Sequence, residues 1–380
     1  MPRGRFLPLR RWLPPSWQAI AAVCLAGGLA AAAGVSWWVH WRRPLLVGMG
    51  LTRPLTRGAA INPSDRYTAD LFLEERPGSR IRLVDILIVP DPAQAAASIT
   101  ALKRRGVRFF VTAYPSNQAL RTLPQFRSGD ALNINVSAAS NALSGRDDYF
   151  LRTVPDVEQE QRAIARELAR RPGGRLLVLQ DTGNPTYTDA AYAVFRRELA
   201  RSGRWQVVHR PLLVKRFSPA TGRSLMQGDF DALYVLAGSF QPAIGPISQL
   251  FHQLHPGDAI LLTPWARSPE IVENAGTANA VTTILSPFPP RRASPALDRY
   301  LKRFEQRYGF TPYALSLGTR QALELYAQAF ASGATNPEAV KRYLLSKPSH
   351  PTSFGPVRFD ARGDGRAPFY AFVPTEDLPR

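Results

Sequence analysis

Cysteine is almost absent from the 380-residue sequence, which contains it once, at Cys24. A single cysteine cannot form an intramolecular disulfide, and it cannot supply the sulfur ligands of a zinc or iron–sulfur site. Cys24 lies within a long apolar run, where we expect it to act as a small apolar residue. The cellular compartment must therefore be inferred from other features of the sequence.

Lysine and the acidic residues are also scarce. Only five of the 48 basic residues are Lys and the rest are Arg, and with 29 Asp and Glu the formal net charge is +19. Such an excess is compatible with a nucleic-acid or anionic-membrane partner. Arg is nevertheless spread over most of the chain, as in a genome that favours Arg. Basic and aromatic residues do not interleave as they do in single-strand binders, so we expect no nucleic-acid partner.

The motifs of common enzymes are missing. The sequence contains no glycine loop of the P-loop or dinucleotide type, no HExxH spacing and no GxSxG elbow. His252 and His255 lie three residues apart, and we interpret them as two surface imidazoles rather than a metal pair. Glu158 and Glu160 begin a predicted helix, where acids favour the positive end of the helix dipole. We therefore expect no enzyme, no metal and no cofactor.

Only one long hydrophobic run is present, at residues 17–39. It has about the 20 apolar residues that a membrane-spanning helix needs. Trp37 and Trp38 lie at its end and Trp41 follows it, where interfacial aromatics anchor a helix. Four Arg and no acid precede it, at Arg3, Arg5, Arg10 and Arg11. The run predicts an uncleaved transmembrane anchor behind a basic cytoplasmic head at 1–16. The alternative is a cleaved signal peptide.

These two possibilities place the remainder of the chain in related compartments. With an uncleaved anchor, the part from residue 44 onward is tethered to the membrane and lies in the periplasm or outside the cell. With a cleaved signal peptide, the same part is secreted into the periplasm. The first 43 residues hold six Arg and no acid, so +6 of the net charge belongs to the membrane-flanking segment.

After residue 43, short apolar runs alternate with amphipathic stretches. Runs such as 107–111 and 175–180 predict strands, and stretches such as 158–170 and 189–202 predict helices. This alternation predicts an α/β fold with parallel sheets built from βαβ units. The strands are too many for one ordinary sheet, which favours two lobes. Near the end, the runs at 356–360 and 368–373 predict a hairpin.

Ligands of open α/β sheets bind outside the carboxyl ends of the strands. That rule selects the segments that follow the predicted strands, at 52–56, 112–117, 137–141, 181–188, 237–242 and 263–268. These segments are rich in hydroxyl and aromatic side chains, contain no His and have few acids. They predict a pocket that hydrogen-bonds and stacks, not one that moves protons.

Several short motifs occur along the chain in a consistent order. They are LLVGMGL (45–51) with Pro54-Leu55-Thr56, Asp91-Pro92-Ala93-Gln94, FFVTAYPS (109–116), Ser137-Ala138-Ala139-Ser140, Phe150-Leu151-Arg152-Thr153, RLLVLQD…PTY (175–187), DFDALYVLAG (229–238) and FGPVRFDARGDG (354–365). Their order and spacing from about 45 to 375 resemble the type I periplasmic solute-binding proteins. That family includes the Leu/Ile/Val-binding proteins of ABC importers.

The resemblance implies a fold of two Rossmann-like lobes joined by three crossovers and preceded by the N-terminal helix. The implied crossovers lie near 154–156, 286–289 and 347–352. Lobe 1 would then comprise 44–154 plus 289–346, and lobe 2 would comprise 156–286 plus 352–378. In such proteins the lobes close on the ligand by a hinge motion.

The resemblance also implies a set of ligand-binding residues. Ser116, Ala138 and Ser140 would hydrogen-bond a ligand carboxylate from the first lobe, and Tyr187 and Phe240 match aromatic positions of the second lobe. The alternative for Ser116, Ser140 and Tyr187 is ordinary loop capping and packing.

The sequence departs from the family at one position. Amino-acid binders of this family place an acid after the strand at 259–263 to hold the ligand's ammonium group. Here Trp265 lies near that position, Arg267 follows, and no Asp or Glu is adjacent. Because an unpaired buried ammonium is costly, the ligand either lacks an amine, stacks on Trp265, or is an anion that meets Arg267.

The function that the sequence favours is a membrane-tethered extracytoplasmic solute-binding protein. It would be the substrate-binding component of an ABC importer for amino acids or a related small carboxylate or amide. Its expected partners are the solute, an ABC permease or another membrane protein, and the membrane through the N-terminal helix. The alternative is a ligand-free sensor or scaffold of the same fold that regulates a membrane partner.

Overall fold

A computed structural model of the chain describes residues 22–26, 28, 43–51, 64–88 and 92–378. The chain divides into two compact units, Met1–Pro44 and Leu45–Arg380. In the first unit residues 22–26 and 28 are helical. The predicted head at 1–16 and most of the predicted span at 17–39 lie outside the described residues. Within the described ranges, no helix combines the length and the apolar character needed to cross a membrane.

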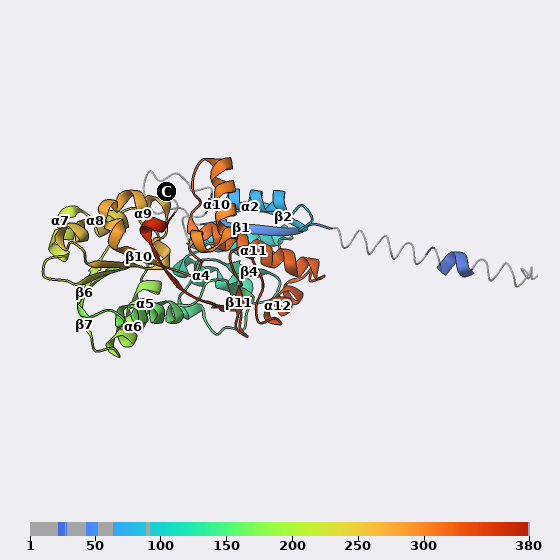
Figure 1. Cartoon of the computed structure of the whole chain (residues 1–380). Coiled ribbons are helices and arrows are strands. Elements are labelled where there is room, and N and C mark those ends of the chain that lie inside the picture. Colours follow the sequence, from blue (N-terminus) through green and yellow to red (C-terminus); the bar gives the residue numbers. More distant parts are fainter. Residues whose placement is uncertain (1–21, 27, 29–42, 52–63, 89–91, 379–380) are drawn as a thin grey trace, which may run out of the picture. The chain divides into compact units, whose positions relative to one another are not determined.

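The described part of the second unit contains two large separate sheets, of five and six strands (Figure 1), and a third sheet of two strands. The first sheet has the order β2-β1-β3-β4-β5, and its paired strands all run parallel. Its strands are β1 (Leu45–Leu51), β2 (Ile81–Ile88), β3 (Phe109–Thr112), β4 (Leu132–Asn135) and β5 (Phe150–Arg152). The helices between them are α2 (Ser64–Glu75), α3 (Pro92–Arg104) and α4 (Ser116–Thr122). Helix α2 was not expected from the sequence, because its buried positions include Ser64 and Thr68, which weaken the apolar period.

The second sheet has the order β13-β10-β9-β8-β6-β7. Its strands are β6 (Gly174–Asp181), β7 (Trp205–Leu212), β8 (Ala232–Leu236), β9 (Ala259–Leu262), β10 (Thr282–Ser286) and β13 (Ala371–Pro374). All pairs are parallel except β10 with β13. The accompanying helices are α5 (Val157–Ala169), α6 (Pro185–Ala200), α7 (Pro219–Leu225), α8 (Ile244–Leu254) and α9 (Pro269–Asn274). The predicted α/β architecture with parallel sheets is confirmed.

The last part of the chain packs helices on the first sheet and adds one strand to the second. Helices α10 (Pro295–Tyr308), α11 (Ala314–Ala331) and α12 (Pro337–Leu345) precede the antiparallel pair β11 (Arg358–Phe359) and β12 (Gly365–Arg366). The predicted hairpin is therefore present, but the expectation that 368–373 forms its second arm was wrong. That run instead enters β13, where Val373 is 1% exposed within the core of the second sheet.

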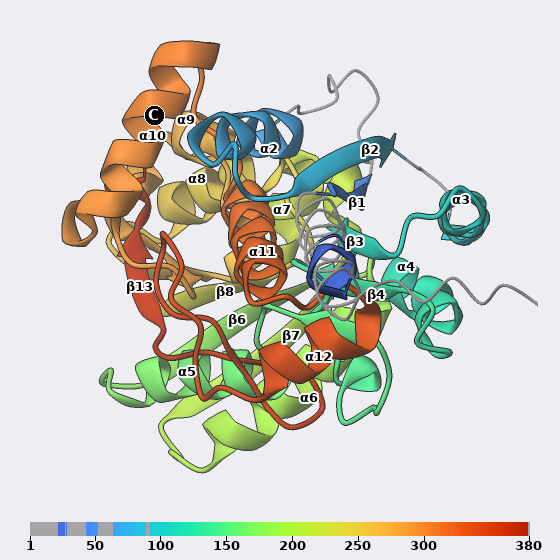
Figure 2. The ribbon, with the colours of Figure 1, turned by 90° about the vertical axis from the view of Figure 1, so that its right-hand side faces the viewer.

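Each sheet is covered by helices on both faces, because its strands are apolar on both sides. Neighbouring residues of a strand point to opposite faces, so Phe109 packs with α11 and α12 while Phe110 packs with α3 and α4. Figure 2 shows α2 and α11 on one side of β1 and β3, and α3 and α4 on the other. In the second sheet α8 and α9 cover one face, and α5 and α6 cover the other.

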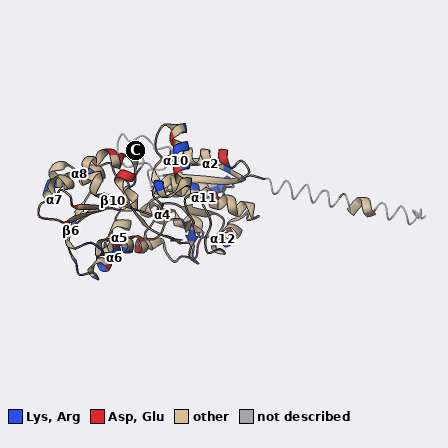
Figure 3. Cartoon of the chain, viewed as in Figure 1, with Lys and Arg blue, Asp and Glu red and all other residues tan. Residues whose placement is uncertain are grey.

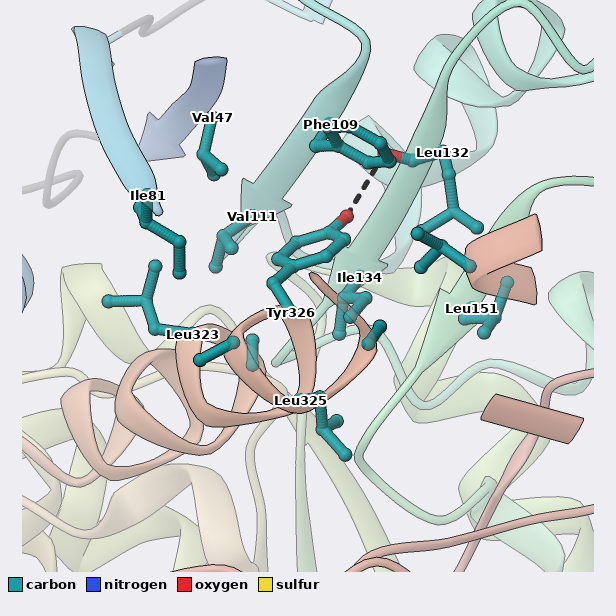
Figure 4. Close-up of a cluster of buried hydrophobic side chains, with 14 of the residues drawn as sticks. Val47, Ile81, Phe109, Val111, Leu132, Ile134, Leu151, Leu323, Leu325 and Tyr326 are labelled. Carbon is teal, nitrogen blue, oxygen red and sulfur yellow. Dashed lines mark hydrogen bonds between the residues drawn. The ribbon is translucent and has the colours of Figure 1, made fainter. Parts of the chain in front are cut away.

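Helix α11 fixes the core of the first sheet. Leu323 and Tyr326 face Val111, Ile134 and their neighbours across this cluster, whereas Leu325 points away from these strands (Figure 4). The Tyr326 hydroxyl lies 2.8 Å from the carbonyl oxygen of Phe110 and 3.1 Å from that of Leu132. A buried phenol is therefore satisfied by the backbone of two neighbouring strands, which locks the helix in register on the sheet.

A buried ion pair joins the end of the first sheet to the C-terminal hairpin. Arg152 is fully buried, and its Nη2 lies 2.5 Å from Oδ1 of Asp364. The same guanidinium donates to the carbonyl oxygens of Ala138 and Ser140, at 3.1 and 3.0 Å. A Cβ added at Gly365 would lie 2.5 Å from the carbonyl oxygen of Val154, so glycine allows this close approach. The pair therefore holds both the 138–140 loop and the hairpin in place.

Among the described residues, Lys and Arg are spread over the outer helices. Lys and Arg alternate with Asp and Glu over these helices in Figure 3. On α5 and α6, Glu158 pairs with Arg162 at 2.7 Å and with Arg197 at 2.5 Å. Exposed pairs of this kind contribute little stability. Their arrangement fits an Arg-rich surface more closely than a binding face for a polyanion.

Candidate functional site

A cavity of about 120 Å³ lies where the carboxyl ends of the two sheets meet. From the first sheet it is lined by residues that follow β3, β4 and β5, and from the second by residues that follow β8, β9 and β10. The start of α11 and Tyr370 close it. Because the strands that line the cavity run parallel within each sheet, their carboxyl ends lie at one edge of that sheet, where ligands of α/β folds bind.

The walls of the cavity are largely apolar and aromatic. The aromatic lining residues are Phe240, Trp265, Phe288, Tyr313 and Tyr370. The polar lining side chains are Ser137, Ser239, Ser286, Glu160 and Arg267, of which the last two carry ionisable groups. An apolar cavity with a few convergent polar groups is the usual form of a small-molecule site.

Arg267 follows β9 through the short helical turn Pro264–Ala266. Its Nη1 donates to Oγ of Ser286 at 2.9 Å. Among the described residues no carboxylate lies within ion-pair distance of its guanidinium. Although part of the side chain is exposed where it lines the cavity, burial lowers the pKa of Arg267 to about 10. The cavity therefore holds a cation that the surrounding protein leaves without a counter-charge.

Glu160 enters the cavity from the first turns of α5 and is 2% exposed. Its Oε1 accepts hydrogen bonds from the hydroxyl of Tyr187 and from Nε2 of Gln161, the latter at 2.8 Å. Burial raises the pKa of Glu160 to about 7, although the hydrogen bond from Tyr187 opposes the rise. A carboxyl in this state is partly protonated at neutral pH.

Tyr187 and Trp265 form an aromatic support behind Glu160. Their rings meet edge to face with centroids 6.1 Å apart. The indole Nε1 of Trp265 lies near enough to the Glu160 carboxyl to oppose the rise of its pKa, yet it lies outside hydrogen-bonding geometry with any described residue. Tyr187 itself is 1% exposed and does not line the cavity. Its contact with Glu160 is therefore structural in this conformation.

The first-sheet residues that the resemblance nominated are engaged by the protein. Oγ of Ser116 accepts from the amide of Ser140 at 3.1 Å, and Oγ of Ser140 donates to the carbonyl of Thr186 at 3.0 Å. The amide of Ala138 donates to Oδ1 of Asn135 at 2.6 Å. These groups lie beside the cavity and do not line it. A ligand would have to replace one of these hydrogen bonds to reach them.

The nominated residues thus separate into two groups. Phe240, Trp265 and Arg267 line the cavity together, whereas Ser116, Ala138, Ser140 and Tyr187 are buried around it. Phe240 meets Tyr313 edge to face at 5.7 Å between centroids. The segment 52–56 lies outside the described residues.

Glu160 is the functional candidate that the sequence analysis missed. The sequence pattern places it at the start of a helix, where an acid favours the helix dipole, and no Asp or Glu is adjacent to Trp265 and Arg267 in the sequence. A signal was present, because the buried residues of α5 repeat at helical spacing and include Glu160. An ionisable residue on the apolar stripe of a helix points to a buried role.

Comparisons with known proteins agree with this geometry. The sequence profile of a family described as periplasmic binding protein matches residues 57–373. A search of curated proteins finds no match to the chain.

Solved structures share the fold. LivK of Thermotoga maritima, a leucine-binding protein, is 20% identical with a TM-score of 0.71, covering 88% of this chain and all of its own. LivJ of Streptococcus pneumoniae, solved with isoleucine, is 17% identical with a TM-score of 0.72 over 87% and 99% of the two chains. A solute-binding protein of an ABC transporter from Rhodopseudomonas palustris, solved with 3,4-dihydroxybenzoic acid, is 15% identical with a TM-score of 0.72 over 84% and 90%.

We predict that Glu160→Gln changes how stability depends on pH. The folded chain holds a proton on Glu160 that the unfolded chain releases near pH 4.5, so the stability contributed by this proton is lost as pH rises through about 7. Between pH 4.5 and 8 the free energy of unfolding of the native chain should therefore fall by up to roughly 3 kcal/mol relative to that of the variant. Urea unfolding of both proteins at four pH values measures this difference.

The control is Glu158→Gln, in the same helical turn, whose carboxylate is partly exposed and paired with Arg162 and Arg197. That variant should keep the pH profile of the native chain. A Glu160→Gln profile parallel to that of the native chain would show that Glu160 is charged in the folded state.

Proposed function

Because the chain belongs to the periplasmic binding protein family, we propose that it is the substrate-binding component of an ABC importer for a small carboxylate. The family consists of solute-binding proteins and not enzymes, and its members act in the periplasm or outside the cell. Structural neighbours with the same fold are named as binding proteins of transporters. Amino acids and related carboxylates or amides are the candidate solutes.

The observation that carries the proposal is the unpaired guanidinium of Arg267 in an aromatic cavity. A charge that is removed from water without a partner is costly, and an anionic ligand would compensate that cost. Arg presents a planar fork that matches a carboxylate with two parallel hydrogen bonds. The apolar walls would then enclose the body of the solute.

The volume of the cavity limits the size of the apolar part of the solute. This volume of about 120 Å³ is near the ~150 Å³ of an apolar cavity that binds benzene. A single ring or a branched alkyl group therefore fits. The expected first-lobe contacts, Ser116, Ala138 and Ser140, remain proposed ligand groups, reached if a ligand replaces their present hydrogen bonds.

We propose that the two sheets are the cores of two lobes that close by a hinge. The proposed lobes are 44–154 plus 289–346 and 156–286 plus the C-terminal segment. Contacts favour starting that last segment after the β11–β12 hairpin and not at 352. Val357 packs in the core of the first sheet, and Asp364 pairs with Arg152.

Membrane tethering is proposed from the sequence, on the apolar run at 17–39 and its Arg-rich flank. The full chain should sediment with membranes and resist extraction by alkaline carbonate, whereas a chain lacking residues 1–43 should stay soluble. Recovery of the full-length product in the soluble fraction, shortened at its N-terminus, would instead identify a cleaved signal peptide.

We predict that carboxylates stabilise the chain through Arg267. Benzoate, 4-methylpentanoate and leucine should each be tested by thermal shift against benzamide, which has the same ring as benzoate without its charge. Carboxylates that fit should raise Tm, and benzamide should not. Arg267→Gln should weaken carboxylate binding at least 30-fold, since a buried charge pair is worth about 2 kcal/mol or more. It should not lower the Tm of the ligand-free protein, because the unpaired charge is removed.

The matched control is Arg292→Gln, since Arg292 is exposed and pairs with Asp377 at 2.9 Å. This variant should bind carboxylates as the native chain does. Failure of all carboxylates to stabilise the native chain would favour the ligand-free sensor or scaffold. In that case a membrane partner should still co-purify after Phe240→Ala, which alters a residue that lines the cavity.

A further inference from the structure

We infer that Tyr313 is a latch that holds the two proposed lobes together at the cavity, so that its hydrogen bond to Glu270 determines how slowly a bound solute leaves. The inference rests on the proposed function, because Tyr313 belongs to the proposed lobe 44–154 plus 289–346 and Glu270 belongs to the other. It concerns the release of the solute and not its recognition.

The backbone of Tyr313 is held by helices of the first sheet. Tyr313 lies directly before α11, and its carbonyl oxygen accepts hydrogen bonds from the amide and the hydroxyl of Ser316, at 3.0 and 2.6 Å. Its own amide donates at 3.2 Å to Oγ of Ser64, the first residue of α2. The Tyr313 side chain therefore starts from a point that is fixed relative to α2 and α11.

The ring and the hydroxyl of Tyr313 both contact the other proposed lobe. The ring meets that of Phe240, which follows β8, edge to face with centroids 5.7 Å apart. The hydroxyl donates to Oε1 of Glu270, which lies in α9. Tyr313 and Phe240 also line the cavity. One side chain thus joins two elements of the second sheet to a fixed point on the first lobe, at the wall of the cavity.

Other polar contacts also cross between the proposed lobes, but they suit this role less well. Arg292 and Asp377 form a pair at 2.9 Å in which the Arg292 side chain is 74% exposed, and exposed pairs contribute little. The hydroxyl of Ser140 donates to the carbonyl oxygen of Thr186, which is a neutral acceptor. The latch bond has a carboxylate as its acceptor, and hydrogen bonds to charged groups are among the stronger ones. The other oxygen of Glu270, Oε2, is buried, so little water reaches that side of the carboxylate.

A latch of this kind acts on dissociation. The solute enters while the lobes are apart, so its association does not use the contact between Tyr313 and Glu270. A bound solute leaves after the lobes have separated, and their separation breaks this hydrogen bond. Loss of the bond should therefore raise the dissociation rate constant and leave the association rate constant almost unchanged.

The test is stopped-flow tryptophan fluorescence on the full chain in mild detergent, with benzoate or 4-methylpentanoate, whichever raises Tm more. Tyr313→Phe keeps the ring against Phe240 and removes the hydroxyl. Its dissociation rate constant should rise about tenfold, while its association rate constant stays within about twofold of that of the native chain. Glu270→Ala should have the same effect. The double variant should dissociate no faster than either single variant, since all three lack the same interaction.

The matched control is Tyr149→Phe. The Tyr149 hydroxyl also donates to a glutamate, Glu338, at 2.5 Å, but both residues belong to the same proposed lobe. This variant should keep the dissociation rate constant of the native chain. An unchanged dissociation rate constant in Tyr313→Phe would overturn the latch. Effects of Tyr313→Phe and Glu270→Ala that multiply in the double variant would overturn it as well.

A second measurement separates this inference from the proposed function. In hydrogen exchange of the ligand-free full chain, peptides that contain the lining residues Ser137 and Ser239 should exchange faster in Tyr313→Phe than in the native chain or in Tyr149→Phe. If neither carboxylate binds, the proposed function is refuted and this comparison alone decides whether Tyr313 holds the lobes together. Faster exchange would support the latch, and unchanged exchange would contradict it.

Discussion

A guanidinium taken out of water needs a counter-charge, and this requirement connects the fold of the protein with its cavity. Among the described residues of the second unit, Arg152 and Arg320 are buried, and Arg267 is partly buried in the wall of the cavity. Arg152 pairs with Asp364, and Arg320 lies 2.5 Å from Glu75 and 3.1 Å from Glu324. Each of these two cations is neutralised inside the protein. Arg267 has only the hydroxyl of Ser286 among the described residues, so its counter-charge must come from outside the fold.

The neutralised arginines hold the parts of the chain that shape the cavity. Arg152 fixes the 138–140 loop and the C-terminal hairpin, both of which contact the end of the first sheet. Arg320 lies on α11, whose first residues close the cavity. Removing one partner of a buried pair leaves an unpaired charge and is strongly destabilising. Arg152 and Arg320, which have acidic partners, therefore hold the chain segments around the cavity. Arg267, which lines the cavity, has no such partner among the described residues.

Much of the fold could be predicted from the sequence because it depends on local patterns. Apolar runs such as 175–180 form buried strands, and helical spacing placed α5 and α6 within a few residues of their true bounds. Helix α2 was missed because polar residues occupy part of its buried face. The pairing of β13 with β10 was missed because the sequence of a short strand near the chain end does not indicate which distant strand it pairs with.

The site was only partly predictable for a related reason. Trp265 and Arg267 could be identified because they follow a strand and replace an acid that the resemblance leads one to expect. Glu160 could not be placed beside them, since it is 105 positions earlier than Trp265 and reaches the cavity only through the packing of α5 against the second sheet. The hydrogen bonds that Ser116, Ala138 and Ser140 make within the protein could not be predicted either, because they depend on how the loops pack in the folded chain.

The most direct test of a carboxylate in this cavity is a crystal structure of the protein purified without added ligand, supported by mass spectrometry of the small molecules it releases. We expect electron density for a retained solute, with a carboxylate against the Arg267 guanidinium and its apolar part against Trp265 and Phe240. A neutral or cationic solute, or a cavity in which a carboxylate of the protein itself pairs with Arg267, would contradict it.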